Sequence, residues 1–385
     1  MLKIAFVGDV LNHGYNLQTI GTAIVFLLSE LDEVDRVDVY CPVANPIKEP
    51  AKFPGKIRLI PYYNYNDPLL GFKLLNIYRG KNYDRVIYNL LATGFGESSL
   101  SNASALFSPM LGEALGESVE VIYHNSVYTN DYRALGYSSL YDEFRGHILG
   151  WVERSLFKSV PTFFFLKLYL ERVGSAIGAN KVRYLNGRGF EAIPTIFLNN
   201  MQETDEITTD YYGNSVKILL HGSWGPQKNL KLGLSTLKRL RDEGFDFDLI
   251  ISGGINHHFP SYEEQFRSLI QEYGFANSYV GRVSEMGIMN LFLNTDLLLL
   301  PYNTPGGHSG ILEQAIFFEL PTVGIDFPEY EEEASGINFV KLCKPDGFYE
   351  ATREMLERAG GVRKVKVREK VKKAVRNITA LIDDQ

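Results

Sequence analysis

The sequence contains few of the features that mark secreted, membrane-spanning or nucleic-acid-binding proteins. Only two cysteines, Cys41 and Cys343, occur in 385 residues, so a disulfide framework is excluded and a reducing cytoplasm is the expected location. No apolar run reaches the roughly 20 residues that a membrane span needs. We expect no signal peptide, because Met1 is followed at once by an apolar strand pattern. The formal net charge of -7 disfavours nucleic acid as the main partner.

The sequence does contain enough apolar residues for two hydrophobic cores. Hydrophobic residues make up 45% of the chain, and a length of 385 residues favours two domains over one. Short apolar runs alternate with helical patterns from Lys3 to Leu185, and the alternation begins again at Val216. Strands that alternate with helices predict mostly parallel sheets with helices on both faces. We therefore predict an α/β protein with two Rossmann-like, doubly wound domains that face a cleft.

A polar stretch between the two halves predicts the domain boundary, between Gly187 and Val216. We predict an N-terminal domain over residues 1–190, a linker over 191–215 and a C-terminal domain over 216–361. In residues 362–385, apolar residues recur at helical spacing, and we expect this tail helix to pack back on the N-terminal domain because its apolar stripe must be buried. Lysines and arginines, Arg363 among them, occupy the other face. They fit a solvated surface and contact with a membrane surface equally well.

The most informative stretch spans residues 296–326. The apolar run Leu297–Leu300 predicts a strand buried on both faces. A loop rich in glycine, proline, asparagine and threonine follows, and Ser309 precedes a helical pattern as a candidate N-cap. Backbone amides at the start of this helix can receive an anion, and Glu313, one turn further on, can accept hydrogen bonds from sugar hydroxyls. A glycine-rich loop before a helix also occurs in doubly wound sheets without any ligand.

Three other loops are expected at the carboxyl ends of strands, where ligands of doubly wound sheets bind. The loop over residues 8–16 holds Gly8 and Gly14, His124 follows the strand that ends at residue 123, and the loop over 222–229 holds Lys228 as a cation for phosphate. The alternative readings are a solvated surface charge for Lys228 and a backbone-bonded strand-end residue for His124. Together these groups suit a nucleoside diphosphate sugar.

Four segments of the chain resemble the retaining glycosyltransferases of family 4 and their relatives with the GT-B fold. The resemblance covers nearly the whole chain. His221 to Asn229 is similar to the loop in which a lysine contacts the donor diphosphate, and residues 281–292 resemble the loop that receives the donor base. Residues 309–315 with 320–323 match the donor-binding helix and the strand after it, and this match is the most specific. Residues 184–187 resemble the interdomain segment.

Two positions depart from the pattern of this family. Pro305 occupies the position of the first of two glutamates separated by seven residues, while Glu313 fits the second. Residues 222–224, Gly-Ser-Trp, occupy the region in which an arginine usually precedes the lysine. The departing diphosphate would therefore meet fewer charges than is usual, which leaves a non-catalytic partner subunit open as an alternative function.

The resemblance implies transfer of a hexose from a nucleoside diphosphate sugar to a hydroxyl, with retention at the anomeric carbon and without a metal or a bound cofactor. It implies catalytic roles for His124, Lys228 and Glu313. The predicted donor-binding residues are Gly14, Gly222, Ser223, Lys228, Asn229, Gly253, Arg282, Val283, His308, Ser309, Gly310, Ile311, Leu312 and Glu313. Expected partners are the nucleotide-sugar donor and an acceptor that is a glycan, a lipid-linked saccharide or a small metabolite.

Another enzyme class stays open on the same fold. A nucleotide-sugar epimerase would need additional acid and base residues in the cleft, and the sequence identifies no convincing set. The identity of the sugar, the base and the acceptor, and the oligomeric state, are also open. Six tyrosines are expected in loops of the first domain, where they would stack on sugar rings or pack locally: Tyr62, Tyr63, Tyr65, Tyr128, Tyr132 and Tyr137.

Overall fold

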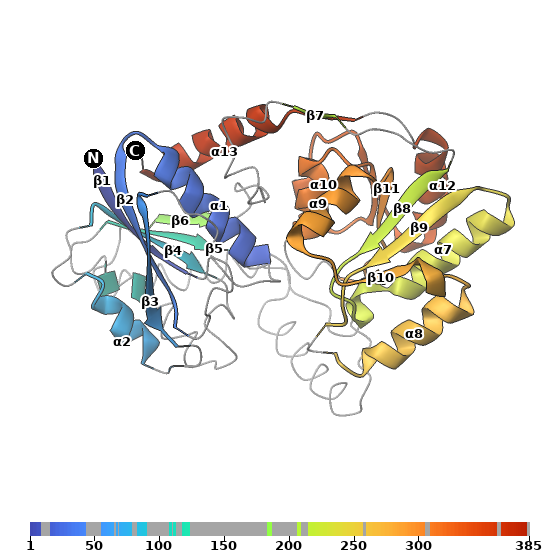
Figure 1. Cartoon of the computed structure of the whole chain (residues 1–385), viewed down its shortest axis with the longest axis horizontal. Helices are drawn as coiled ribbons and strands as arrows, with labels where there is room; N and C mark the ends of the chain where they lie inside the picture. The colour runs from blue at the N-terminus through green and yellow to red at the C-terminus, as the bar shows by residue number, and fades with distance from the viewer. Residues whose placement is uncertain are drawn as a thin grey trace. The chain divides into compact units, whose positions relative to one another are not determined.

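The structure is a computed structural model, and it describes residues 1–8, 16–43, 55–64, 67, 69–78, 83–90, 108–109, 111–112, 118–123, 183–186, 206–208, 215–256, 259–304, 309–359 and 363–382. The chain divides into two compact units (Figure 1). Unit 1 comprises Met1–Val127, Pro161–Asp205 and Val367–Gln385, and unit 2 comprises Tyr128–Val160 and Glu206–Lys366. Among the described helices, none is long and apolar enough to cross a membrane. Most of the predicted linker lies outside the described residues, so its bounds stay a prediction.

Unit 1 is built on a six-stranded parallel sheet. Its strands are β1 (Leu2–Val7), β2 (Val34–Pro42), β3 (Ile57–Tyr63), β4 (Arg85–Leu90), β5 (Val119–Tyr123) and β6 (Arg183–Asn186). They lie in the order β3-β2-β1-β4-β5-β6, with every neighbouring pair parallel. The chain winds outward in both directions from β1 and β4, which is the doubly wound order. Helix α1 (Asn16–Glu30) contacts β2 and β3, and the short helix α2 (Leu70–Leu75) contributes to the core.

The core of unit 1 buries tyrosines whose hydroxyls bond to one another. The hydroxyls of Tyr40 and Tyr83 lie 2.8 Å apart, and Tyr83 donates a hydrogen bond to the buried carboxylate of Asp38 at 2.6 Å. Burial, with the bond to Asp38, raises the pKa of Tyr83. The prediction that Tyr62 and Tyr63 lie in a loop is wrong, because both belong to β3 and Tyr63 is only 1% exposed. The other four tyrosines of that set, Tyr65, Tyr128, Tyr132 and Tyr137, lie outside the described residues.

Unit 2 repeats the strand order of unit 1. Its strands are β8 (Val216–His221), β9 (Phe247–Ser252), β10 (Tyr279–Gly281), β11 (Leu297–Leu300), β12 (Thr322–Ile325) and β13 (Val340–Cys343), in the parallel order β10-β9-β8-β11-β12-β13. All residues of β11 and β12 are buried, as strands covered on both faces require. The prediction of two Rossmann-like parallel-sheet domains is therefore confirmed.

Helices cover both faces of the unit 2 sheet (Figure 1). Helices α7 (Leu230–Asp242), α8 (Tyr262–Glu272) and α12 (Phe348–Arg358) share one core with the strands. Helices α9 (Glu285–Leu293) and α10 (Gly310–Phe317) lie on the other side, and the short helix α11 (Pro328–Glu333) contacts α10. The region after β12, with α11, β13 and α12, had no predicted elements.

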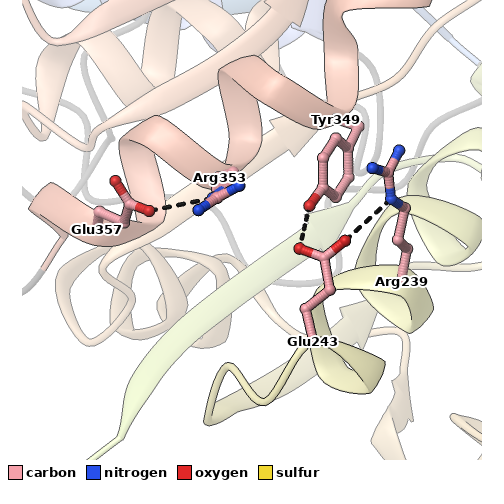
Figure 2. A network of polar contacts seen from close by, with 5 residues as sticks. All are labelled: Arg239, Glu243, Tyr349, Arg353 and Glu357. Carbon is pink, nitrogen blue, oxygen red and sulfur yellow. Dashed lines mark hydrogen bonds and ion pairs between the residues drawn. The ribbon is translucent and has the colours of Figure 1, made fainter.

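A polar network joins α7 and α12, which are far apart in the sequence (Figure 2). Glu243 follows α7 and accepts a hydrogen bond from the Tyr349 hydroxyl of α12 and another from Arg239 at 3.1 Å. The Arg239 guanidinium lies 3.5 Å from the centroid of the Tyr349 ring, a cation–π distance. The bond from Tyr349 holds the pKa of Glu243 below its ordinary value. Arg353 extends the network along α12 by pairing with Glu357 at 3.1 Å. The contacts of Tyr349 with Glu243 and Arg239 join the C-terminal end of α7 to the first turn of α12.

The tail departs from the prediction in its first residues. Lys364–Val365 form the short strand β14, which pairs antiparallel with β7 (Ile207–Thr208). Helix α13 (Val367–Ile382) begins only after it and contacts α1. Residues 21–29 of α1 are all buried, and a helix that is apolar on every side must be covered on every side. Val371 and Ile378 of α13 are buried as well.

Arg363 does not lie on an exposed basic face, contrary to the prediction. It is half-buried, and its guanidinium donates hydrogen bonds to the main-chain carbonyls of Phe292, Leu293 and Thr295 at 2.7, 3.0 and 2.8 Å and of Phe318 at 3.0 Å. These carbonyls lie at the C-terminal ends of α9 and α10, where a helix leaves carbonyl groups unsatisfied and favours a cation. Burial lowers the pKa of Arg363 to about 10. Arg363 thus ties the last segment of unit 2 to both helices.

We expect Arg363→Ala to lower the free energy of unfolding by about 2–4 kcal/mol, because four carbonyl groups would lose a charged donor. Lys364→Ala is the matched control. The Lys364 side chain is 67% exposed and pairs with Glu206 at 3.6 Å, so its removal should cost less than about 1 kcal/mol. Urea unfolding followed by circular dichroism gives both values. Equal, small effects for the two variants would contradict this role of Arg363.

Candidate functional site

The strand order of unit 2 indicates one candidate site, at the carboxyl ends of β8 and β11. These two strands are neighbours, and the chain winds away from them in opposite directions. Ligands of doubly wound sheets bind at such a point, because the loops that follow the two strands diverge. The loop after β8 contains the predicted residues 222–229. The loop after β11 leads to Ser309, and the structure describes it up to residue 304.

Close backbone approach at Gly222 and Gly253 brings several segments together at this point. Gly253 has a φ of +109°, and a Cβ on it would lie 1.8 Å from the carbonyl oxygen of Gly222. A Cβ on Gly222 would lie 3.2 Å from Cδ1 of Ile311 and 3.7 Å from both Cε of Lys228 and the Tyr302 hydroxyl. Glycine is therefore required at Gly253, and the bare backbone of Gly222 lies where Lys228, Tyr302 and α10 meet.

Lys228 ends a single turn of 3-10 helix, Pro226–Lys228, directly before α7. Its ammonium lies 3.6 Å from the centroid of the Tyr302 ring, a cation–π contact. Burial lowers the pKa of Lys228 to about 7. Burial, together with the Lys228 charge, lowers the pKa of the neighbouring His221 to about 4. An anion bound here would restore to Lys228 the electrostatic stabilisation that it loses by leaving water.

Asn303 holds the two loops together. Its main-chain amide donates to the carbonyl of Gln227 at 2.9 Å, and its side-chain amide donates to the carbonyl of Pro226 at 3.3 Å. Asn229, a predicted donor-binding residue, has a structural role in the backbone here. Its φ of 43° and ψ of 48° turn the chain from the 3-10 turn into α7. Lys228 therefore projects from a main chain that is anchored on both sides.

Helix α10 begins as the sequence predicted. The Ser309 hydroxyl accepts a hydrogen bond from the amide of Leu312 at 3.3 Å, so the predicted N-cap is confirmed. Ser309, Gly310 and Leu312 are buried, while Ile311 and Glu313 are half-buried. Glu313 lies in the first turn, and its amide donates to the carbonyl of Ser309 at 2.9 Å. The start of α10 thus has the geometry of a helix N-terminus that receives anions.

In the segment that occupies the place of the usual arginine before Lys228, Trp224 belongs to the hydrophobic core. Trp224 is 1% exposed, its ring lies 5.6 Å from that of Phe266, and its indole nitrogen donates to the carbonyl of Ser252 at 3.0 Å. A charged side chain could not replace it without burying a charge. Ser223, the residue before it, is exposed.

The predicted base-binding residues follow β10, which lies two strands away from β8. Two strand spacings amount to about 10 Å. Arg282 is exposed and donates to the carbonyl of Ile255 at 3.3 Å, while Val283 is half-buried. A Cβ on Gly254 would lie 2.0 Å from Nε of Arg282, so this side chain lies across the Gly254 backbone. Among the described residues, Arg282 contacts Ile255 and Gly254 rather than Lys228, so a ligand would have to be extended to reach both loops.

Three predicted site residues, Gly14, His124 and His308, lie outside the described residues, and their roles stay predictions. Among the residues that are described, no group of three or more histidine, cysteine, aspartate or glutamate side chains could hold a metal ion. The sequence reasoning missed Tyr302 and Asn303. Both lie in the loop after β11, which was singled out for its glycine and proline content. No local sequence pattern indicates that Tyr302 lies against Lys228.

Comparison with known proteins shows similarity in structure only. No family model matches the chain, and no curated protein matches it. A sucrose-phosphate synthase from Thermosynechococcus elongatus is similar with a TM-score of 0.54 and 13% identity, over 100% of this chain and 95% of that one. HepE from Anabaena, solved with UDP, has a TM-score of 0.52 and 13% identity, over 99% and 94%. A UDP-GlcNAc 2-epimerase from Methanocaldococcus jannaschii has a TM-score of 0.51 and 13% identity, over 99% of both chains. Such low identities show the GT-B fold alone.

We expect Gly253→Ala to destabilise unit 2 by about 3 kcal/mol or more, because the added methyl group combines backbone strain with a clash against Gly222. Gly244→Ala is the matched control. Gly244 also has a positive φ, +93°, but an added Cβ would meet nothing within 4 Å. Strain alone should cost about 1–2 kcal/mol there. Thermal unfolding of both variants measures the difference, and equal losses would mean that the loops do not cross this closely.

Proposed function

We propose that the protein is a glycosyltransferase that moves a hexose from a nucleoside diphosphate sugar to a hydroxyl acceptor, with retention at the anomeric carbon. The observation that carries the proposal is the position of Lys228. A half-buried ammonium group lies beside the N-terminus of α10, at the point where β8 and β11 diverge. A cation and helix amides together suit a diphosphate. Retention rests on the resemblance to family 4 described above.

In this proposal the protein binds the donor through its diphosphate, which is also the leaving group of the reaction. Glycosyl transfer builds negative charge on the departing diphosphate oxygen while positive charge develops at the anomeric carbon. Lys228 and the first turn of α10 are in place before the reaction, so they can stabilise the departing charge without reorganisation. The negative charge of the ligand raises the pKa of Lys228, which keeps the ammonium protonated in the complex.

The remaining predicted residues contact other parts of the donor. Glu313 accepts hydrogen bonds from the ribose hydroxyls, and the loop with Arg282 and Val283 receives the base, about 10 Å from the diphosphate across two strands. His124 acts near the transferred sugar. We further propose that the reaction needs no metal ion, so that EDTA leaves turnover unchanged.

An epimerase is the second candidate, because a UDP-GlcNAc 2-epimerase has the same fold at a similar level of similarity. Both enzymes would bind the same donor, so the products decide between them. Proton NMR of the protein with UDP-glucose, UDP-GlcNAc, GDP-mannose and their relatives distinguishes the cases. Release of nucleoside diphosphate with a sugar of unchanged anomeric configuration supports a retaining transferase. A change at C2 of the sugar supports an epimerase. If no product forms, whether or not a nucleotide sugar binds, the result supports a non-catalytic subunit.

We expect Lys228→Ala to weaken nucleotide-sugar binding by about 1.5–3 kcal/mol, because a charge-assisted bond to phosphate is lost. The wild-type protein should also take up protons on binding near pH 8. Lys228, with a pKa of about 7, is largely neutral there without ligand and becomes protonated in the complex. Calorimetric titration in buffers of different ionisation enthalpy measures this uptake. The diphosphate of a nucleotide sugar does not titrate near neutral pH, so the uptake should vanish in Lys228→Ala. Unchanged affinity with the fold intact would remove Lys228 from the site.

We expect Glu313→Gln to weaken donor binding by about 1–3 kcal/mol, because one acceptor oxygen that faces the ribose is replaced by a donor. Its effect on stability should be at most about 1 kcal/mol, through the helix dipole. Calorimetric titration and thermal unfolding of the same sample separate the two effects. A loss of stability without a loss of affinity would mean that Glu313 serves α10 only, and the partner-subunit function would then be favoured.

A further inference from the structure

Two buried hydroxyl groups in the loop after β11 have no hydrogen-bond partner among the residues that the structure describes. They belong to Tyr302, which is 2% exposed, and Thr304, which is 5% exposed. The side-chain oxygen of Gln227, in the loop bonded to Asn303, is also buried and without a partner in that same part of the chain. The large majority of buried side-chain polar atoms are paired in folded proteins. Three exceptions in two adjoining loops therefore indicate partners that the described part of the chain does not supply.

The Tyr302 hydroxyl points to the place where the loop after β8 meets α10. It lies 3.7 Å from the position of a Cβ on Gly222, and the same position is 3.2 Å from Ile311 in the first turn of α10. The ammonium of Lys228 lies over the face of the Tyr302 ring, 3.6 Å from its centroid. The ring of Tyr302 thus contacts the cation, while its hydroxyl lies near the Gly222 backbone, which the side chain of Ile311 in α10 also approaches.

Packing fixes the Tyr302 side chain in this orientation. Its ring lies 6.3 Å from that of Tyr330 in an edge-on arrangement, and the next residue, Asn303, is bonded to Gln227 and Pro226. Burial raises the pKa of Tyr302, so the hydroxyl keeps its proton and can donate it to an anion. A fixed, protonated hydroxyl is a preorganised hydrogen-bond donor.

We propose that Tyr302 and Thr304 are ligands of the donor diphosphate, whose phosphoryl oxygens accept hydrogen bonds from both hydroxyls beside Lys228 and the first turn of α10. This inference rests on the proposed function and assigns residues that the motif comparison did not include. It also bears on one departure of the sequence, because uncharged hydroxyls would supply hydrogen bonds to the diphosphate at a site that lacks the preceding arginine.

Tyr302→Phe tests the proposal, because it removes the hydroxyl and keeps the ring under Lys228. The hydroxyl has no partner in the described fold, so the melting temperature should stay unchanged or rise. The affinity for inorganic pyrophosphate, and for the nucleoside diphosphate that the wild type binds best, should fall about tenfold to a hundredfold. Thr304→Val, of nearly equal shape, should behave in the same way. Tyr330→Phe is the matched control, because its ring contacts Tyr302, and it should leave both affinities unchanged.

The outcomes separate this inference from the proposed function. If Tyr302→Phe and Thr304→Val bind pyrophosphate like the wild type while Lys228→Ala does not, the hydroxyl ligands are disproved and the proposed function stands. If the wild type binds neither pyrophosphate nor any nucleoside diphosphate sugar, both fail together. A clear drop in the melting temperature of Tyr302→Phe would show that the hydroxyl is bonded within the fold, and it would overturn the inference.

Discussion

The pairing of β8 with β11 is the constraint on which the candidate site depends. Both are interior strands of a parallel sheet, and β11 is buried along its whole length. Their registry places the carboxyl end of one beside that of the other, so two loops that are far apart in the sequence must begin side by side. Lys228 and Tyr302 meet for that reason, and the bond from Asn303 to Gln227 then keeps them in position. The chemistry proposed for the site is a consequence of this sheet order.

The sequence was sufficient to predict those features whose physical cause lies in neighbouring residues. The bounds of β11 and β12 were predicted to the residue because strands covered on both faces are mostly apolar. Ser309 was recognised as an N-cap because capping depends on neighbouring residues. Gly253 was included among the predicted donor-binding residues, but the reason for glycine there, the nearby Gly222 carbonyl, comes from another loop.

The features that were missed depend on contacts between distant segments. Arg363 belongs to a run of basic residues that looks solvated, yet its partners are the ends of two helices some 45 to 71 positions earlier. Trp224 lies in what reads as a polar loop, but the ring fills the core against Phe266. The contact of Tyr302 with Lys228 has the same character, because nothing close to either residue in the sequence predicts the other.

The placement of α13 has a consequence for synthesis of the chain. Residues 21–29 of α1 are all buried, and α13, which follows unit 2 in the sequence, supplies part of their cover. Unit 2 needs no residue beyond Lys366. On a ribosome, where domains form in the order in which they emerge, unit 2 can therefore be complete while α1 still exposes apolar surface. Unit 1 begins before unit 2 but is completed after it, so the nascent chain carries an unfinished unit 1 until α13 has emerged.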